Sequence, residues 1–188
     1  MKKIKTIFDR DWKGKRGVIN SLVVDEIILS GCFATEKVDG TNIRLTIRSG
    51  QVVRVEKRKN PSKEQKTKGI IEPWYIDAKI SSSNDKWIFD AVFNTDFSNI
   101  EDGVFSGEAF GKNIQGNPLG IDNNKVFLFG HKETLNKAIL KDVPLSYDEL
   151  KYYLQSSKSL FNNTKQIEGI VWHNAHGDKF KIKLKDFK

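Results

Sequence analysis

The stretch that decides the fold is Glu36-Lys37-Val38-Asp39-Gly40-Thr41-Asn42-Ile43-Arg44. From residue 43 onward, apolar and polar side chains alternate, which is the period of a β-strand. The Asp-Gly pair ahead of this strand is typical of a tight turn. Lys37 is therefore predicted to lie at the mouth of a sheet and outside any helix. A lysine there can act as a covalent nucleophile when burial or neighbouring cations favour its uncharged amine.

The same stretch has a purely structural interpretation. An Asp-Gly pair between alternating apolar residues is a strong hairpin signal and requires no chemistry. The interpretation of Lys37 as a nucleophile therefore depends on what the rest of the chain supplies.

Length and composition indicate a globular protein. The chain has 188 residues, of which 38% are hydrophobic and 30% charged, enough for one domain with a core. It contains no apolar run of membrane-spanning length and no secretory leader, so we expect a cytoplasmic protein without membrane association. Cys32 is the only cysteine, which excludes a disulfide within the chain and a cysteine-based zinc site.

The charge balance indicates the class of partner. The formal net charge is +8 and the isoelectric point is near 9.4. Such a basic excess suits a polyanion, either nucleic acid, nucleotide or acidic lipid. The alternative is a basic protein whose charge only keeps it in solution.

The hydrophobic pattern predicts an α+β fold with mainly antiparallel strands. The expected strands cover residues 33–38, 41–48, 51–58, 103–109, 125–129, 167–173 and 179–185. Expected helices begin after Ser82 or Ser83 and, through a capping box, at Ser146. Residues 59–70 are lysine-rich and polar, and are expected to form a mobile surface loop. No linker composition divides the chain, so residues 1–188 are expected to form a single domain.

The last expected strand alternates lysines with apolar residues. Period two places Lys181 and Lys183 on one face, together with Lys179 and Lys185, and Phe180 and Ile182 on the other. Two such ammonium groups could hold phosphate oxygens and would favour the uncharged amine of Lys37. The alternative is an edge strand protected by lysines.

Two glutamates and two phenylalanines are further candidates. Glu108 and Glu168 each lie beside a glycine near a strand, and a carboxylate in a basic cleft suits Mg²⁺. Phe127 and Phe129 share one face of their strand and could stack on a base. The alternatives are surface glutamates and, for at least one phenylalanine, core packing. The three histidines show no convincing metal-ligand spacing.

Taken together, these residues resemble the ordered motifs of the covalent nucleotidyltransferases, which are the DNA ligases, RNA ligases and mRNA capping enzymes. The matching segments, in the order of that superfamily, are Lys37-Val38-Asp39-Gly40, Lys57-Arg58, Phe105-Ser106-Gly107-Glu108, Phe127 with its neighbours, Ile167-Glu168-Gly169-Ile170-Val171 and Lys181-Ile182-Lys183.

Within this superfamily the chain looks most like small single-domain ATP-dependent RNA ligases. The segments 36–42, 111–118 and 181–187 carry this closer likeness. The resemblance implies an antiparallel-sheet nucleotidyltransferase, or adenylation, domain. Because the chain stops just after the fifth motif, neither an appended OB-fold nor a C-terminal domain is expected.

The resemblance also implies an activity: sealing of 5′-phosphate and 3′-hydroxyl RNA ends through a lysyl-AMP intermediate and adenylylated RNA. Lys37 would be the nucleophile, Lys181 and Lys183 would contact the α-phosphate, and Glu168 would hold Mg²⁺ or Mn²⁺. The implied ATP-binding residues are Glu36, Asn42, Arg58, Glu108, Phe127, Lys181 and Lys183, with Phe129 as the alternative for stacking on adenine. An accessory RNA-binding protein could supply additional RNA contacts.

Two other functions remain open at this point. One is a DNA ligase or guanylyltransferase-like enzyme that acts with a partner. The other is a non-catalytic basic RNA-binding domain.

Overall fold

The computed structural model describes residues 4–188, which form two compact units. We call residues 39–135 the central unit, and residues 4–38 together with Asn136–Lys188 the terminal unit. The chain passes from the terminal to the central unit between Val38 and Asp39, so the boundary falls inside the Lys37–Gly40 motif.

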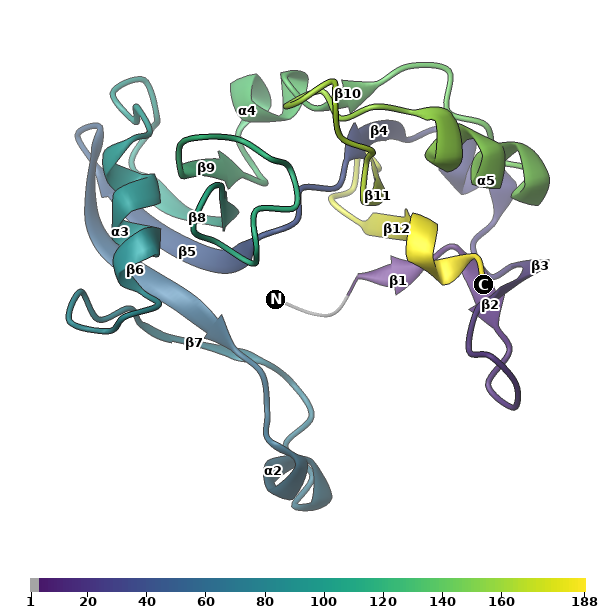
Figure 1. The fold of residues 1–188 in the computed structure, drawn as a ribbon, viewed down its shortest axis with the longest axis horizontal. Coiled ribbons are helices and arrows are strands. Elements are labelled where there is room, and N and C mark those ends of the chain that lie inside the picture. Colours follow the sequence, from purple (N-terminus) through teal and green to yellow (C-terminus); the bar gives the residue numbers. More distant parts are fainter. Residues whose placement is uncertain (1–3) are drawn as a thin grey trace. The chain divides into compact units, whose positions relative to one another are not determined.

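The central unit is built on a five-stranded antiparallel sheet (Figure 1). Its strands, in spatial order, are β7 (Trp74–Asp77), β6 (Gln51–Lys59), β5 (Thr41–Arg48), β8 (Gly103–Phe110) and β9 (Lys125–Leu128). Ile43, Leu45 and Ile47 point to one face of β5 and are fully buried in the core. Helix α3 (Lys86–Phe93) packs on this core through Ile88 and Ala91, so the opposite face of the sheet carries the polar side chains.

A second five-stranded sheet organises the terminal unit. Its order is β1 (Lys5–Thr6), β12 (Lys179–Lys183), β11 (Gly169–His173), β4 (Phe33–Glu36) and β10 (Ile139–Leu140). β1 runs parallel to β12, and the other neighbours are antiparallel. Trp172, Ile170 and Ile182 are buried against α5 (Tyr147–Ser156), which contributes Leu150 and Leu154.

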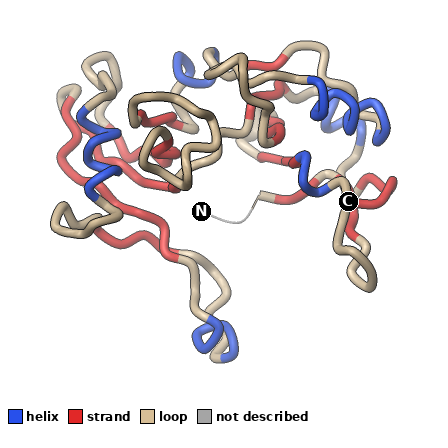
Figure 2. Tube along the Cα trace, viewed as in Figure 1, coloured by secondary structure: helices blue, strands red, loops and turns tan. Residues whose placement is uncertain are grey.

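Short elements complete both units (Figure 2). In the terminal unit these are the hairpin β2 (Phe8–Arg10) and β3 (Val18–Leu22), helix α1 (Glu26–Ser30) and the 3₁₀ turn η1 (Leu184–Asp186). Helix α2 (Lys63–Thr67) belongs to the central unit, and α4 (Lys132–Asn136) ends where the chain returns to the terminal unit. None of the helices in the described part of the chain is both long and apolar enough to cross a membrane.

The predicted α+β class with mainly antiparallel strands is confirmed, and several boundaries differ. The segment 59–70, expected to be a mobile loop, instead contains α2. A capping box between Ser62 and Gln65 forms the N-terminus of this helix. Helix α3 begins at Lys86. Ser146 is the N-cap residue of α5, as expected, but its hydroxyl donates to the Glu149 carboxylate and makes no capping bond to the backbone. The last strand ends at Lys183, so Lys185 lies in η1 and not on the lysine face of β12.

Candidate active site

Lys37 lies one residue beyond the end of β4, in the terminal unit. Its backbone N–H donates to the Gly169 carbonyl oxygen at 2.9 Å, which extends the pairing between β4 and β11. Its Nζ donates to Glu168 Oε2 at 2.6 Å, and 19% of its side chain is exposed. The neighbouring strand therefore holds the predicted nucleophile at the end of the sheet, as the alternation in the sequence indicates.

Glu168 joins two lysines. Its Oε2 accepts from Lys37, and its Oε1 accepts from Lys183 Nζ at 2.5 Å. The Glu168 and Lys183 side chains are 14% and 20% exposed, so little water screens the two ion pairs. The backbone fixes this geometry, because the Leu184 N–H donates to the Glu168 carbonyl at 3.0 Å. Two ammonium groups and one carboxylate give a cluster of net positive charge that attracts phosphate.

Lys181 extends the cationic face of β12. Ile182 between the two lysines is fully buried in the core, so Lys181 and Lys183 share the opposite face, as predicted. Lys181 also pairs with Thr6 of β1, and β12 is therefore not an edge strand at this position. At Lys181, therefore, the alternative interpretation of these lysines as charges that protect an unpaired edge strand is wrong.

Glu36 occupies a different environment from Lys37. Its side chain is 1% exposed, and Oε2 accepts from the Leu160 N–H at 2.6 Å. Oε1 is buried and has no hydrogen-bond partner within the described residues. Burial raises the pKa of the Glu36 carboxyl, an effect that hydrogen bonds from Ser159 and Leu160 partly offset. The fold thus places a buried carboxyl with a raised pKa directly beside the predicted nucleophile Lys37 in the chain.

Three of the predicted nucleotide-binding residues are neighbours on the polar face of the central sheet. Asn42 pairs with Glu108, and Glu108 pairs with Phe127, across β5, β8 and β9. The Asn42 amide nitrogen donates to the Gly107 carbonyl at 3.2 Å and to Glu108 Oε2 at 3.4 Å. The register that pairs Ile43 with Lys57 places Arg58 on this face as well.

The sequence interpretation missed Tyr75 and Arg44. The Tyr75 hydroxyl donates to Asn42 Oδ1 at 2.8 Å and lies 3.3 Å from Ser106 Oγ. The Arg44 guanidinium lies 4.4 Å from the Tyr75 ring centroid and donates two hydrogen bonds of 2.7 Å to Glu56. These bonds hold the pKa of Glu56 below its usual range. Alternation put Arg44 and Asn42 on one face, but no sequence signal shows that Tyr75 pairs across from Arg58.

Phe127 and Phe129 differ in exposure. Phe127 is 4% exposed, whereas Phe129 is half-buried just after β9. Their ring centroids are 6.1 Å apart in an edge-to-face arrangement. Both rings therefore belong to one aromatic cluster of the central unit, and the choice between them for adenine stays a prediction.

Two glycines allow close backbone approach at the predicted motifs. A Cβ on Gly40 would lie 2.1 Å from the Ala109 carbonyl oxygen, and one on Gly169 would lie 2.2 Å from the Ile182 carbonyl oxygen. Any larger residue would push the strands apart beside Lys37 and beside Glu168. The glycine requirement in both motifs is thus a matter of strand packing.

The donor set allows a hard metal ion but does not enclose one. Among residues 4–188, no group of three or more His, Cys, Asp or Glu side chains could hold a metal. Mg²⁺ retains water and is often held by one or two carboxylates plus substrate phosphates, so Glu168 alone on the protein side is compatible with it.

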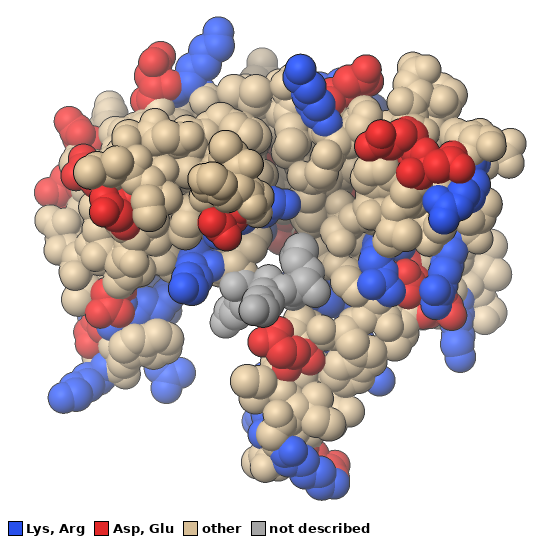
Figure 3. Space-filling view, turned by 180° about the vertical axis from the view of Figure 1, so that it is seen from behind, with Lys and Arg blue, Asp and Glu red and all other residues tan. Residues whose placement is uncertain are grey.

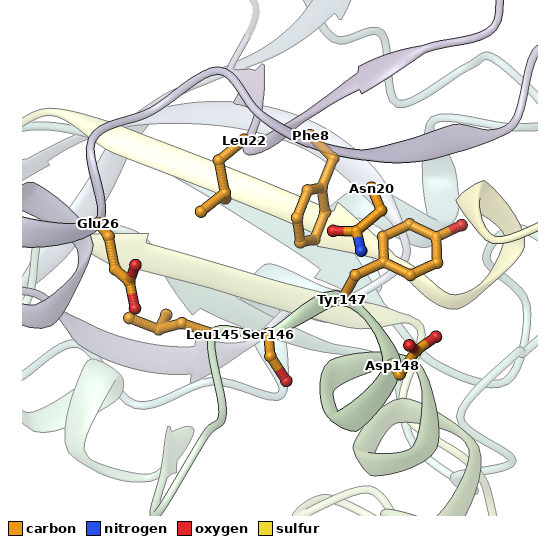
Figure 4. Close-up of a pocket in the computed structure, with 8 residues that line it drawn as sticks. All are labelled: Phe8, Asn20, Leu22, Glu26, Leu145, Ser146, Tyr147 and Asp148. Carbon is orange, nitrogen blue, oxygen red and sulfur yellow. The ribbon is translucent and has the colours of Figure 1, made fainter.

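A pocket of about 270 Å³ lies in the terminal unit (Figure 4). Its lining residues are Phe8, Asn20, Leu22, Glu26, Leu145, Ser146, Tyr147 and Asp148. None of the predicted site residues is among them.

Comparison with solved structures identifies the fold as one that RNA ligases contain. Two structures of the Naegleria gruberi RNA ligase superimpose with a TM-score of 0.50 each. One is a lysine-to-methionine mutant with AMP and Mn, 16% identical, matching 84% of this chain and 51% of its own. The other is a lysine-to-alanine mutant with ATP and Mn, 14% identical, matching 98% of this chain and 61% of its own.

The present chain therefore spans less than two thirds of either solved ligase. At this level of identity the likeness concerns the fold alone. No protein-family profile and no curated protein sequence matches the chain.

Proposed function

We propose that the protein is an ATP-dependent RNA ligase that seals 5′-phosphate and 3′-hydroxyl RNA ends. The observation that carries this proposal is the bridge from Lys37 through Glu168 to Lys183 at the end of the terminal sheet. It combines a lysine nucleophile, a group that can accept its proton and a second cation for the phosphate. The likeness of the fold to RNA ligase structures supports the choice of substrate class.

The first step would form a lysyl-AMP. The Lys37 amine attacks the α-phosphorus of ATP, a nitrogen–phosphorus bond forms, and the bond to the bridging oxygen breaks to release pyrophosphate. Glu168 lies within hydrogen-bonding distance of Lys37 Nζ and can accept the proton that this amine loses. Lys183 and Lys181 balance the charge that develops on the phosphoryl oxygens.

The next two steps transfer and then release AMP. An oxygen of the RNA 5′-phosphate attacks the same phosphorus, the nitrogen–phosphorus bond breaks, and the Lys37 amine recovers a proton. The 3′-hydroxyl of the other RNA end then attacks the 5′-phosphorus and expels AMP. A lysine that forms and breaks a covalent bond divides one difficult condensation into easier transfers.

The remaining predicted residues would bind ATP. Arg58 and Glu108 are assigned to the ribose and phosphates, Phe127 to adenine, and Asn42 and Glu36 to further nucleotide contacts. Mg²⁺ or Mn²⁺, when bound, would be held by Glu168 with phosphate oxygens and water, and would neutralise phosphate charge.

The decisive experiment is mass spectrometry of the protein incubated with ATP and Mg²⁺. We expect a mass increase of one AMP, mapped to Lys37, and no such adduct on Lys37→Ala. Lys79→Ala, which removes an exposed lysine of the central unit, is the control and should form the adduct normally. A wild-type-level adduct on Lys37→Ala would show that the nucleophile is misassigned.

Two further assays separate the proposal from its alternatives. Covalent labelling by GTP and not by ATP would identify a guanylyltransferase. Sealing of nicked DNA but not of RNA would identify a DNA ligase, and no adduct with either nucleotide would indicate a non-catalytic RNA-binding domain. Lys37→Ala should still seal chemically pre-adenylylated RNA, because that substrate bypasses the first step.

A further inference from the structure

The hairpin between β6 and β7 carries an arm that extends beyond its sheet. The last paired residues of the two strands are Lys59 and Trp74, so residues 60–73 lie outside the ladder. Figure 1 shows this segment leading away from the sheet, with α2 at its tip. No residue of α2 is buried, and no residue between Asn60 and Pro73 belongs to the hydrophobic core cluster of the central unit; Pro61, ahead of α2, is the buried residue of the segment.

The arm is ordered by its own hydrogen bonds. The Ser62 N–H donates to Gln65 Oε1 at 2.9 Å, and the Gln65 N–H donates to Ser62 Oγ at 3.1 Å. The Ile70 N–H closes the tip on the Gln65 carbonyl at 2.9 Å. These hydrogen bonds fix the conformation of a segment that contributes no side chain to the hydrophobic core. Such a segment is preorganised for a partner, because it loses less conformational entropy on binding.

Among the charged side chains of the arm, cations outnumber anions by four to two. Lys63, Lys66 and Lys68 lie at the tip and Lys59 at the base, against only two acidic residues, Glu64 and Glu72. In Figure 3, Lys and Arg side chains lie at the tip of the lowest projection, and acidic side chains lie on the same projection. The one ion pair within the arm, Lys68 with Glu64 at 2.7 Å, has both side chains more than two thirds exposed. Such a pair is weak, so a phosphate can compete for Lys68.

Apolar surface accompanies these charges. Ile70 and Ile71 are 45% and 70% exposed, directly after the lysine-bearing turn. At the base, the Lys59 ammonium lies 5.8 Å from the Trp74 ring centroid. Cations that contact a backbone, interleaved with apolar or aromatic groups that contact bases, are the combination that binds single-stranded nucleic acid.

We infer that this arm, residues 59–74, binds the RNA strand that the enzyme seals. The inference rests on the proposed function and extends it, since it assigns the RNA-binding surface that the ATP-binding residues do not provide. The polar face of the central sheet is engaged in its own network around Asn42, Tyr75 and Arg44. The arm, in contrast, presents three lysines within six residues that have no partner in the core.

Two arm variants test the inference. The first is Lys63→Gln with Lys66→Gln and Lys68→Gln, which removes charge and retains helix propensity. The second replaces residues 60–73 by Asn-Gly, which joins the paired residues Lys59 and Trp74 through a two-residue turn. The control removes three exposed lysines elsewhere, through Lys13→Gln, Lys15→Gln and Lys132→Gln. For each protein we would measure lysyl-AMP formation and the affinity for a single-stranded RNA of about 20 nucleotides over a range of salt.

Both arm variants should bind RNA at least about tenfold more weakly. The slope of the logarithm of the RNA-binding constant against the logarithm of the salt concentration should become shallower by about 2, as expected for three lost phosphate contacts. Lysyl-AMP formation should stay within about twofold of wild type, because the arm does not take part in that step. The control should lose less affinity than the arm variants. Unchanged RNA affinity in both arm variants would overturn the inference. The arm would then bind a protein or have no partner.

The two proposals fail differently. Absence of the lysyl-AMP adduct in the wild-type protein would overturn the proposed function, while the binding assay, which requires no catalysis, would still decide whether the arm contacts RNA. Normal adduct formation with undiminished RNA affinity in the arm variants would overturn the arm alone.

Discussion

A single carboxylate determines the electrostatics of the candidate site. Glu168 holds both Lys37 and Lys183, and each pair is short and at least four fifths buried. An anionic phosphate that approaches must compete with Glu168 for these lysines, and the exchange frees the carboxylate to take a proton or a metal ion. At the residue scale, the site is thus an ion cluster that one negatively charged ligand can rearrange.

The lysines of β12 test this arrangement. Under the proposed function, Lys183→Ala and Lys181→Ala should each reduce lysyl-AMP formation by about a hundredfold or more, because each removes a preorganised charge that the proposal assigns to the phosphate. The free energy of unfolding, measured by thermal denaturation, should change by about 1 kcal/mol at most, since Glu168 retains Lys37 as its partner.

The control for these two variants is Lys185→Ala, because Lys185 is exposed in η1. Lys179 is unsuitable as a control, because burial lowers its pKa and it pairs with His173. Equal, small effects of Lys181→Ala, Lys183→Ala and Lys185→Ala would leave β12 without a role in catalysis.

His173 predicts a pH dependence of stability. Its ring stacks on Phe33 at 4.8 Å, and Nε2 lies 2.9 Å from Thr35 Oγ1. Burial, and then the nearby charge of Lys179, lower its pKa from 6.5 to about 4. Because the folded pKa lies below the unfolded one, the stabilisation is complete above pH 6.5 and is lost as the pH falls toward 4.

As the pH falls from 7 to 5, the titration of His173 should lower the free energy of unfolding by about 2 kcal/mol. His173→Gln should flatten that part of the stability profile, measured by denaturant unfolding at each pH. His176→Gln, at an exposed position of the same hairpin turn, should leave the profile unchanged. A profile that His173→Gln does not alter would show that the ring is not held in its neutral form.

At the scale of elements, alternation and turn chemistry predicted the strands that carry the site. Period two placed Lys181 and Lys183 on one face because Ile182 must enter the core. Helix α2 was missed because its five residues bury nothing and therefore lack apolar periodicity. The sequence Ser62-Lys63-Glu64-Gln65 did contain its signal, a capping box. The two-residue strands β1 and β10 exist only through their partners, so no local pattern could indicate them.

Close packing of the Gly40 turn leads to a prediction about β5 and β8. Gly40→Ala should destabilise the protein by about 2 kcal/mol, because the new Cβ would collide with the Ala109 carbonyl that pairs beside it. Gly130→Ala, also in the central unit, meets no atom within 4 Å and should change stability by less than about 0.5 kcal/mol. Denaturant unfolding of both variants measures the difference, and similar values for the two would contradict the packing argument.

At the scale of the molecule, the sequence did not indicate two compact units. The crossing at Val38–Asp39 lies inside the Lys37–Gly40 motif, and the return near Leu135 has no glycine, proline or serine run. Composition therefore gave no signal of a boundary. The cluster of Lys37, Glu168 and Lys183 was predictable because all three lie at ends of neighbouring strands. The burial of Glu36 and the network around Tyr75 were not, because both depend on packing between segments far apart in sequence.

The lysine-bearing tip of the arm also makes the chain vulnerable in one defined place. Trypsin cleaves after lysine, and exposed tips are preferred sites of nicking, so the first cuts should follow Lys63, Lys66 or Lys68. The two fragments should stay together after cleavage, because β6 and β7 are paired from Glu56 with Asp77 to Lys59 with Trp74. Limited digestion followed by gel filtration would show a nicked protein of unchanged size, and single-stranded RNA should slow the cut. First cleavage elsewhere in the chain would mean that a protease does not reach the tip.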